Sequence, residues 1–320
     1  MGTITTTTIP ATSDEINFDN ICQEIHESSD KPNVLVRILT GLSQLECRKI
    51  SEDYKRIYGE DLVRICQNME AEVSFLSNLM LYPSERDAKF ARGALERSES
   101  VDYKALIEIF TCRKSSHVML MLEAYRFKYR RHLDLDIAAI EPSHPYQKIL
   151  MALSASHKAH NAEISQHIAK CDARRLYQTG EGNAGAIDEA VVLEILSKRS
   201  IPQIKLTLFT YSHIYGHSYT AFLKSREFGD FEDAVRVVAA CIRSPSKYYA
   251  KTLHECLTGT TTSGALVRIL VSRAEVDMDE IRRIFKDKYG KELKNVICES
   301  VQEENYRGFL AALCNKASTC

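Results

Sequence analysis

The chain of 320 residues has no tryptophan, only 7 prolines and 13 glycines, and no long apolar run. Because a membrane-spanning helix needs about 20 consecutive apolar residues, the sequence excludes a transmembrane helix. No secretory signal opens the chain, so we expect a soluble, intracellular protein. The scarcity of glycine and proline within its apolar runs favours helices.

An excess of charge of one sign is also missing. Lys and Arg number 42 against 43 Asp and Glu, which gives a net charge of −1. This balance excludes a protein drawn to nucleic acid by its overall charge. The 10 cysteines include no CxxC pair. We therefore expect reduced thiols rather than a disulfide framework or a zinc site.

What the chain does have is a short pattern, an aromatic residue followed four residues later by tyrosine, that occurs four times. The copies are Tyr54/Tyr58, Tyr125/Tyr129, Tyr211/Tyr215 and Phe285/Tyr289. Successive copies start 71, 86 and 74 residues apart. A second marker, an isoleucine within an apolar run, repeats these intervals at Ile38, Ile109, Ile195 and Ile269. Two markers with the same unequal spacing indicate a fourfold repeat.

The apolar residues within a copy follow the period of an α-helix. In the first copy they are Val34, Leu35, Ile38, Leu39 and Leu42, the spacing of one buried helix face. The same order of five helical runs returns in each copy, so we predict an all-α fold. The predicted repeats are 14–92, 93–168, 169–252 and 253–320, after a flexible N-terminal arm at 1–13.

Four segments resemble the annexin family, and its plant branch in particular. They are 58–62 (YGEDL), 82–88 (YPSERDA), 264–270 (GALVRIL) and 272–277 (SRAEVD). With the fourfold register, the likeness extends over nearly the whole chain. It implies four annexin-like repeats of five short helices packed into a slightly curved disc. It also implies a convex face that binds membrane phospholipid through calcium held by interhelical loops.

The family holds calcium with backbone carbonyls of a Gly-x-Gly-Thr loop and a carboxylate about forty residues later, in keeping with the preference of calcium for oxygen ligands. The fourth repeat comes nearest, with Thr258, Gly259, Thr260 and Thr261 in the loop and Glu299 as the acid. Threonine stands at both motif glycine positions, 258 and 260, where an unfavourable backbone conformation costs about 1–3 kcal/mol. We therefore predict a weak calcium site.

The other three repeats depart further from the pattern. The first has no loop glycine and offers Glu70 or Glu72 as the acid, and the second has no loop glycine and offers Glu141. The third has glycines in a longer loop, with Arg226 beside Glu227 near the acid position. The pattern as a whole favours solvated loops without metal in all four repeats. The expected cofactor is Ca²⁺, bound weakly or at part of the sites, with no bound calcium as the alternative.

Other routes to a membrane are open. The absence of tryptophan removes the indole that a family member can insert into the interface. A basic stretch at 126–132 (RFKYRRH) attracts anionic headgroups or forms the solvated face of a helix. Met1 and Gly2 begin a match to the N-myristoylation pattern, which short Thr-rich arms also match by chance.

Some plant annexins are discussed as redox-active through two cysteines and a histidine. Cys241 matches one cysteine, but Thr111 stands at the partner position, with Cys112 one residue away, and Gly41 replaces the histidine. A shift of one residue turns a helical side chain by about 100°. Buried, inert thiols are therefore the simpler interpretation.

A histidine-rich segment between the second and third repeats offers transition-metal ligands. His160, Glu163 and His167 share one face of a predicted helix, and His157 lies nearby. A solvated linker helix explains the segment equally well without a metal.

Together these observations predict a non-enzymatic, cytoplasmic, annexin-like protein that binds anionic phospholipid membranes in a calcium-dependent way. The alternative is a calcium-independent membrane or cytoskeletal scaffold that acts through actin or other proteins. A redox enzyme using Cys241 is a third hypothesis. No nucleic-acid partner is expected.

Overall fold

The computed structural model describes residues 17–69, 74–96, 100–159, 163–183, 187–225, 229–259 and 264–316. These residues form helices and loops without a strand, which confirms the predicted all-α fold. The predicted arm at 1–13 lies outside the described residues. No helix in this part of the chain is long and apolar enough to cross a membrane. The chain divides into two compact units, Met1–Met80 and Leu81–Cys320.

The first unit contains the first group of helices. These are α1 (Phe18–Glu27), α2 (Pro32–Gly41), α3 (Gln44–Tyr58), α4 (Leu62–Asn68), a 3₁₀ turn (Ser74–Leu76) and α5 (Ser77–Met80). Helix α3 packs on α1, α4 and α5. Its start is fixed by a capping box, in which Ser43 and Glu46 each satisfy a backbone N–H of the other residue. Ile25, Leu39 and Tyr54 are fully buried and form part of the apolar core of this unit.

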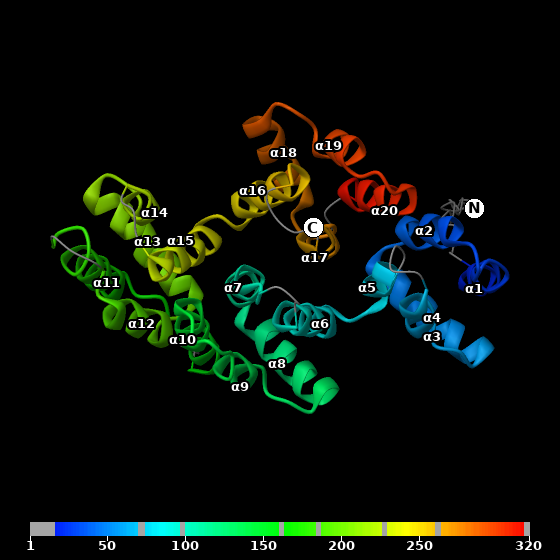
Figure 1. Ribbon diagram of the computed structural model, residues 1–320, viewed down its shortest axis with the longest axis horizontal. Coiled ribbons are helices and arrows are strands. Elements are labelled where there is room, and N and C mark those ends of the chain that lie inside the picture. The colour runs from blue at the N-terminus through cyan, green and yellow to red at the C-terminus, as the bar shows by residue number, and fades with distance from the viewer. Residues whose placement is uncertain are drawn as a thin grey trace, which may run out of the picture. The chain divides into compact units, whose positions relative to one another are not determined.

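The second unit contains three further groups of five helices (Figure 1). The second group is α6 (Pro83–Leu95), α7 (Tyr103–Thr111), α8 (Ser115–Tyr129), α9 (Leu133–Ala138) and α10 (Pro145–Ala159). The third is α11 (Gln166–Gln178), α12 (Glu189–Lys198), α13 (Ile201–Tyr215), α14 (Tyr219–Phe222) and α15 (Asp230–Arg243). The fourth is α16 (Pro245–Leu257), α17 (Gly264–Arg273), α18 (Met278–Tyr289), α19 (Leu293–Ser300) and α20 (Glu304–Cys314).

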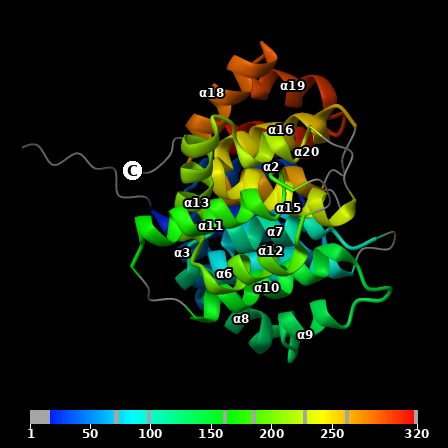
Figure 2. The ribbon, with the colours of Figure 1, turned by 90° about the vertical axis from the view of Figure 1, so that its left-hand side faces the viewer.

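Each of these groups repeats the same internal packing. The first helix lies against the third, in the pairs α6 with α8, α11 with α13 and α16 with α18. The second and third groups meet where α10 contacts α12 and α15 contacts α7, helices that lie together in Figure 2. The predicted repeat limits at 92/93, 168/169 and 252/253 fall inside α6, α11 and α16. If the repeat limits are placed before α6, α11 and α16, each of these helices stays in the same repeat as the helix that it packs against.

The third helix of every group ends in a residue with left-handed backbone conformation. Glycine holds this position at Gly59, Gly216 and Gly290, with φ of 72°, 78° and 72°. In the second group the position is held by Arg130, with φ of 57°. Left-handed conformation suits glycine and costs other L-residues about 1–2 kcal/mol. The repeat therefore keeps the geometry of this helix end even where glycine is lost.

Replacing Arg130 by glycine is expected to raise the free energy of unfolding by about 1 kcal/mol, because it relieves this conformational cost. Loss of the Arg130 guanidinium from its position 5.2 Å from the centre of the Phe127 ring offsets about 0.5 kcal/mol of the gain. Urea unfolding followed by circular dichroism measures the change. The matched control is Lys128→Gly in the same helix, which should lower stability by about 1 kcal/mol. A similar loss in both variants would contradict the prediction.

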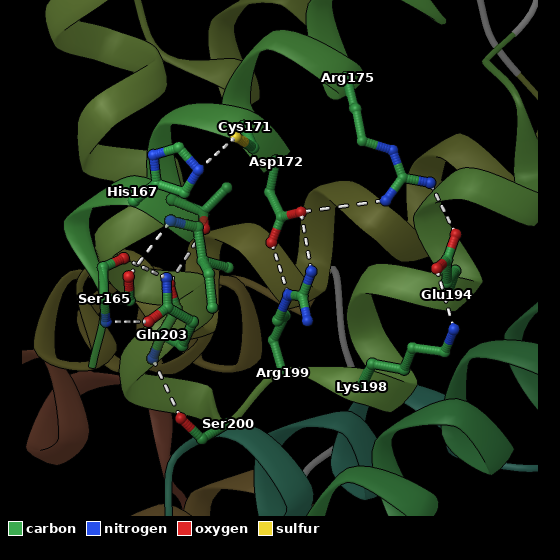
Figure 3. A network of polar contacts seen from close by, with 12 residues as sticks. Ser165, His167, Cys171, Asp172, Arg175, Glu194, Lys198, Arg199, Ser200 and Gln203 are labelled. Carbon is green, nitrogen blue, oxygen red and sulfur yellow. Dashed lines mark hydrogen bonds and ion pairs between the residues drawn. The ribbon is translucent and has the colours of Figure 1, made fainter. Parts of the chain in front are cut away.

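Two buried ion pairs connect helices in the second and third groups in the same way. Asp87 of α6 accepts from Arg113, with 2.8 Å between Oδ2 and Nε. Asp172 of α11 accepts from Arg199, with 2.7 Å between the equivalent atoms (Figure 3). Both carboxylates are almost fully buried. Because an unpaired buried charge is costly, each pair fixes the first helix of its group against the segment that follows the second.

A third buried pair connects two groups that are distant in sequence. Glu108 of α7 is fully buried and accepts from Arg268 of α17, with 3.0 Å between Oε2 and Nη2. Asp102, the N-cap of α7, lies 3.6 Å from the same guanidinium. The second and fourth groups are thus linked directly through the interior of the second unit.

Candidate functional site

The predicted calcium loop of the fourth group begins where α16 ends. Thr258 is its C-cap, and the Thr258 hydroxyl donates to the His254 carbonyl at 2.9 Å. Gly259 follows with a left-handed φ of 77°, and both residues are exposed. Thr260 and Thr261 lie outside the described residues. A left-handed glycine therefore does occur in this loop, at the place that the family pattern leaves variable.

The predicted acid of this site already has a cationic partner. Glu299 lies in the last turn of α19, and its Oε2 accepts from Lys291 Nζ at 2.9 Å. Both side chains are more than half exposed. Such an exposed pair is weak, about 0–1 kcal/mol, so a divalent cation can displace the lysine. Helix α16 packs against α19 within the same group.

The acids proposed for the other repeats have different surroundings. Glu141 is exposed in the loop before α10. Glu70, Glu72, Arg226 and Glu227 lie outside the described residues. In the longer loop of the third group, Glu181 accepts from the Tyr211 hydroxyl at 2.6 Å and pairs with His217 at 2.8 Å. The Glu181 carboxylate therefore ties its loop to the third helix of the group.

The second tyrosine of the repeated pattern has a structural role that the sequence did not reveal. In three groups it stacks on a ring from the helix before the candidate loop: Tyr58 on His26, Tyr215 on Tyr177 and Tyr289 on His254. The ring centres are 4.0, 4.0 and 3.8 Å apart. In the second group the Arg92 guanidinium takes the place of the ring, 5.6 Å from the centre of Tyr129. These contacts fix the end of the helix that leads into each loop.

The histidine-rich segment is not one helix, and this part of the metal prediction is wrong. Helix α10 ends at Ala159 and α11 starts at Gln166, so Glu163 lies in the connection and not on a shared face with His167. His160 lies outside the described residues. His157 is buried, with its ring nitrogens 2.6 Å from the Phe110 carbonyl and 3.0 Å from the Ser115 hydroxyl. His167 instead contacts Cys171, 3.7 Å from Nε2 to Sγ (Figure 3).

The cysteine pair is closer than the sequence suggested. Cys112 Sγ donates to the Cys241 carbonyl at 3.9 Å, and both residues are free thiols. Cys112 is the C-cap of α7, and it contacts Cys241 although it lies one residue beyond the position that matches the family. A hydrogen bond from the Cys241 thiol lowers the pKa of the Cys112 thiol, and burial raises the pKa of Cys241 well above its usual value. The redox hypothesis stays a prediction, and Gly41 still offers no histidine.

The basic stretch at 126–132 spans the end of α8 and the turn after it. Six of its seven residues are exposed, and Tyr129 is partly buried. Phe127 is 75% exposed, so the stretch presents one large apolar ring among cations. This surface fits both open interpretations, a membrane contact or a solvated helix face. Gly2 lies outside the described residues, so acylation stays a prediction.

Comparison with known proteins identifies the family. A family model described as annexin matches residues 171–238 and 248–312. The chain is 31% identical to annexin A3 of Mus musculus over 96% of this chain and 95% of that protein. It is 32% identical to annexin A6 of Mus musculus over 89% of this chain, but spans only 42% of that longer protein. The solved structure of annexin III superposes with a TM-score of 0.83 at 29% identity, covering 95% of both chains. The chain belongs to the annexin family.

Proposed function

We propose that this chain binds anionic phospholipid membranes peripherally, in a calcium-dependent way, through weakened calcium sites. Family membership supports the general activity. The observation that carries the proposal is in the fourth group, where left-handed Gly259 follows exposed Thr258 and the acidic Glu299 lies on a helix that packs against α16. The loop after α16 would supply backbone carbonyls and Glu299 would supply a carboxylate, the oxygen ligands that calcium prefers.

Two features support weak rather than strong binding. Glu299 must leave Lys291 before it can face a cation. Glu181, the carboxylate in the loop of the third group, is held by Tyr211 and His217. Fewer available oxygens lower calcium affinity, because the ion takes six to eight of them. We place the protein in the cytoplasm, at membrane surfaces, without enzymatic activity. Membership of the plant branch stays a prediction.

Vesicle co-sedimentation tests this function. Calcium should increase pelleting of the protein with phosphatidylserine vesicles, and Glu299→Gln should abolish the increase by removing the ligand charge. The matched control is Glu292→Gln, which removes a carboxylate at the start of the same helix that pairs with Lys286. Equal pelleting in calcium and in a chelator would instead favour the calcium-independent scaffold. No pelleting at any calcium concentration would refute membrane binding.

Replacing Lys291 by methionine should lower the calcium concentration needed for half-maximal pelleting by about fivefold. The reason is that a unit charge about 4 Å away contributes about 1 kcal/mol in water, and this charge now competes for Glu299. The control, Lys286→Met, frees Glu292 instead and should leave the requirement unchanged. If Lys291→Met left the calcium concentration for half-maximal pelleting unchanged, Glu299 would not be a calcium ligand.

A further inference from the structure

A large cavity in the second unit is separate from the candidate calcium loop. It has a volume of about 580 Å³ and lies among α7, α14, α15, α16, α17 and α18. Its apolar lining includes Val237 and Ala240 of α15 and Ala265 of α17. Most of its charged residues are exposed, so the cavity opens to solvent. Cavities of about 300–1,000 Å³ are the usual size for small ligands.

The lining of this α15–α16 cavity is strongly cationic. The positively charged residues are Lys104, Lys224, Arg236, Arg243, Lys247, Lys251, Arg268 and Lys288. Only two carboxylates, Asp102 and Glu255, lie among them. This leaves an excess of six positive charges in one cavity of a chain whose net charge is −1. Such a concentration produces a local positive potential that attracts anions.

Half of these cations already have partners. Arg268 pairs with Glu108, Arg236 with Asp233 and Lys251 with Glu255, and Lys288 Nζ lies 5.0 Å from the centre of the Tyr289 ring. The other half have side chains that form no ion pair or hydrogen bond with any residue in the described ranges, and these are Lys104, Lys224, Arg243 and Lys247. Like charges held together repel one another by about 1 kcal/mol per pair at 4 Å even in water. A bound anion would remove this repulsion.

The cations determine the class of anion. They come from five helices and from Lys224, two residues after the end of α14, so they line the cavity from several elements. A single phosphate would contact few of them, whereas several phosphates on one small ring would contact many. Arginine binds phosphate through two parallel hydrogen bonds, and lysine acts as a point charge. The hydroxyls of Thr220 and Ser244 at the same cavity add polar partners.

We propose that the α15–α16 cavity binds a small anion carrying several phosphate groups, of the inositol polyphosphate type, without calcium. The same chemistry occurs in a free inositol polyphosphate and in the headgroup of a phosphoinositide lipid. This site does not depend on the candidate calcium loop. Its four cations without an ion pair or hydrogen bond in the described ranges suit an anion that carries several negative charges.

Isothermal titration of the full chain with inositol hexakisphosphate in EGTA tests the proposal. We expect saturable binding at one site, weakened about tenfold or more when Arg243→Ala and Lys247→Ala are combined, because two unpaired cations are lost. The control variant combines Arg126→Ala and Lys128→Ala, which removes two exposed cations from α8 and should leave affinity unchanged. Circular dichroism should show that both variants keep the helical fold.

Absence of saturable binding, or an equal loss of affinity in the control variant, would overturn the site. Vesicles containing phosphatidylinositol bisphosphate, sedimented in EGTA, distinguish the source of the anion. Pelleting that inositol hexakisphosphate competes away identifies a lipid headgroup. Binding of the free anion without pelleting identifies a soluble ligand. Either result supports the cavity as a polyphosphate site.

Discussion

Replacing Asp87 by asparagine is expected to lower the free energy of unfolding by about 3–5 kcal/mol, the cost of leaving a buried charge without its partner. Asp87 accepts from Arg113 Nε at 2.8 Å and lies 2.8 Å from His117 Nε2. Arg113 is itself buried and also donates to the Tyr249 hydroxyl at 2.9 Å. Asparagine keeps the shape of the side chain, so the loss would measure the charge and not a cavity.

The same carboxylate should make stability depend on acid pH. Burial alone would raise the pKa of Asp87, but the Arg113 charge and the hydrogen bond from His117 outweigh it and hold the pKa well below its usual range. A lowered pKa in the folded state contributes stability above the unfolded pKa of about 3.9, and this is lost as pH falls towards the folded value. The difference between wild type and Asp87→Asn should therefore be constant near neutral pH and narrow below about pH 4.

Urea unfolding followed by circular dichroism is suited to both measurements, because the fold is helical and the chain has no tryptophan. The control is Asp287→Asn, which breaks the exposed Arg283–Asp287 pair and should change stability by less than about 0.5 kcal/mol. A loss below about 1 kcal/mol in Asp87→Asn, or one that persists unchanged at acid pH, would contradict the assigned role.

Replacing Glu108 by leucine should cost about 3 kcal/mol, since Arg268 would remain buried and Asp102, at 3.6 Å, would be the one carboxylate that the described residues still place within ion-pair distance of it. Burial alone would lower the pKa of Arg268, but the facing Glu108 outweighs it and raises that pKa above its usual range. Combining Glu108→Leu with Arg268→Met should recover most of the loss, because apolar residues of similar volume often replace a buried ion pair without cost.

A double-mutant cycle measures this coupling between Glu108 and Arg268, which we expect to be about 2–3 kcal/mol. The exposed pair Arg283–Asp287 provides the comparison cycle, with an expected coupling below about 0.5 kcal/mol. Additive losses in the two single variants would show that the pair does not act as a unit.

The sequence predicted those features that depend on local order. The spacing of Tyr54, Tyr125, Tyr211 and Phe285 indicated four copies, and apolar periodicity indicated helices. The lengths of individual helices were harder to predict, because helix ends depend on local breaks and caps. Glu163 and His167 were assigned to one helix, although α11 begins at Gln166 after a break. That break removed the shared face on which the metal prediction relied.

Features that depend on contacts between distant helices could not be predicted from the sequence. The stacking of His26 on Tyr58 depends on the angle between the two helices that carry these residues. The periodicity of the sequence does not determine that angle. The cavity cations are spread along the sequence from Lys104 to Lys288, so only the folded chain places them around one cavity. The candidate calcium site stays a prediction for another reason, since Thr260 and Thr261 lie outside the described residues. Its test is the response of membrane binding to Glu299 and Lys291.

The Glu108–Arg268 pair also bears on how the second unit assembles. In an open array of repeats each module contacts only its sequence neighbours, so modules can be removed from an end one by one. Here the pair joins residues that are 160 positions apart in the sequence. Arg113 of the second group likewise donates a hydrogen bond to Tyr249 of the fourth group. The second and fourth groups thus contact each other directly, although the third group separates them in the sequence. A chain still lacking its fourth group would leave Glu108 without its cation, so we infer that this contact forms in a late, cooperative step in folding.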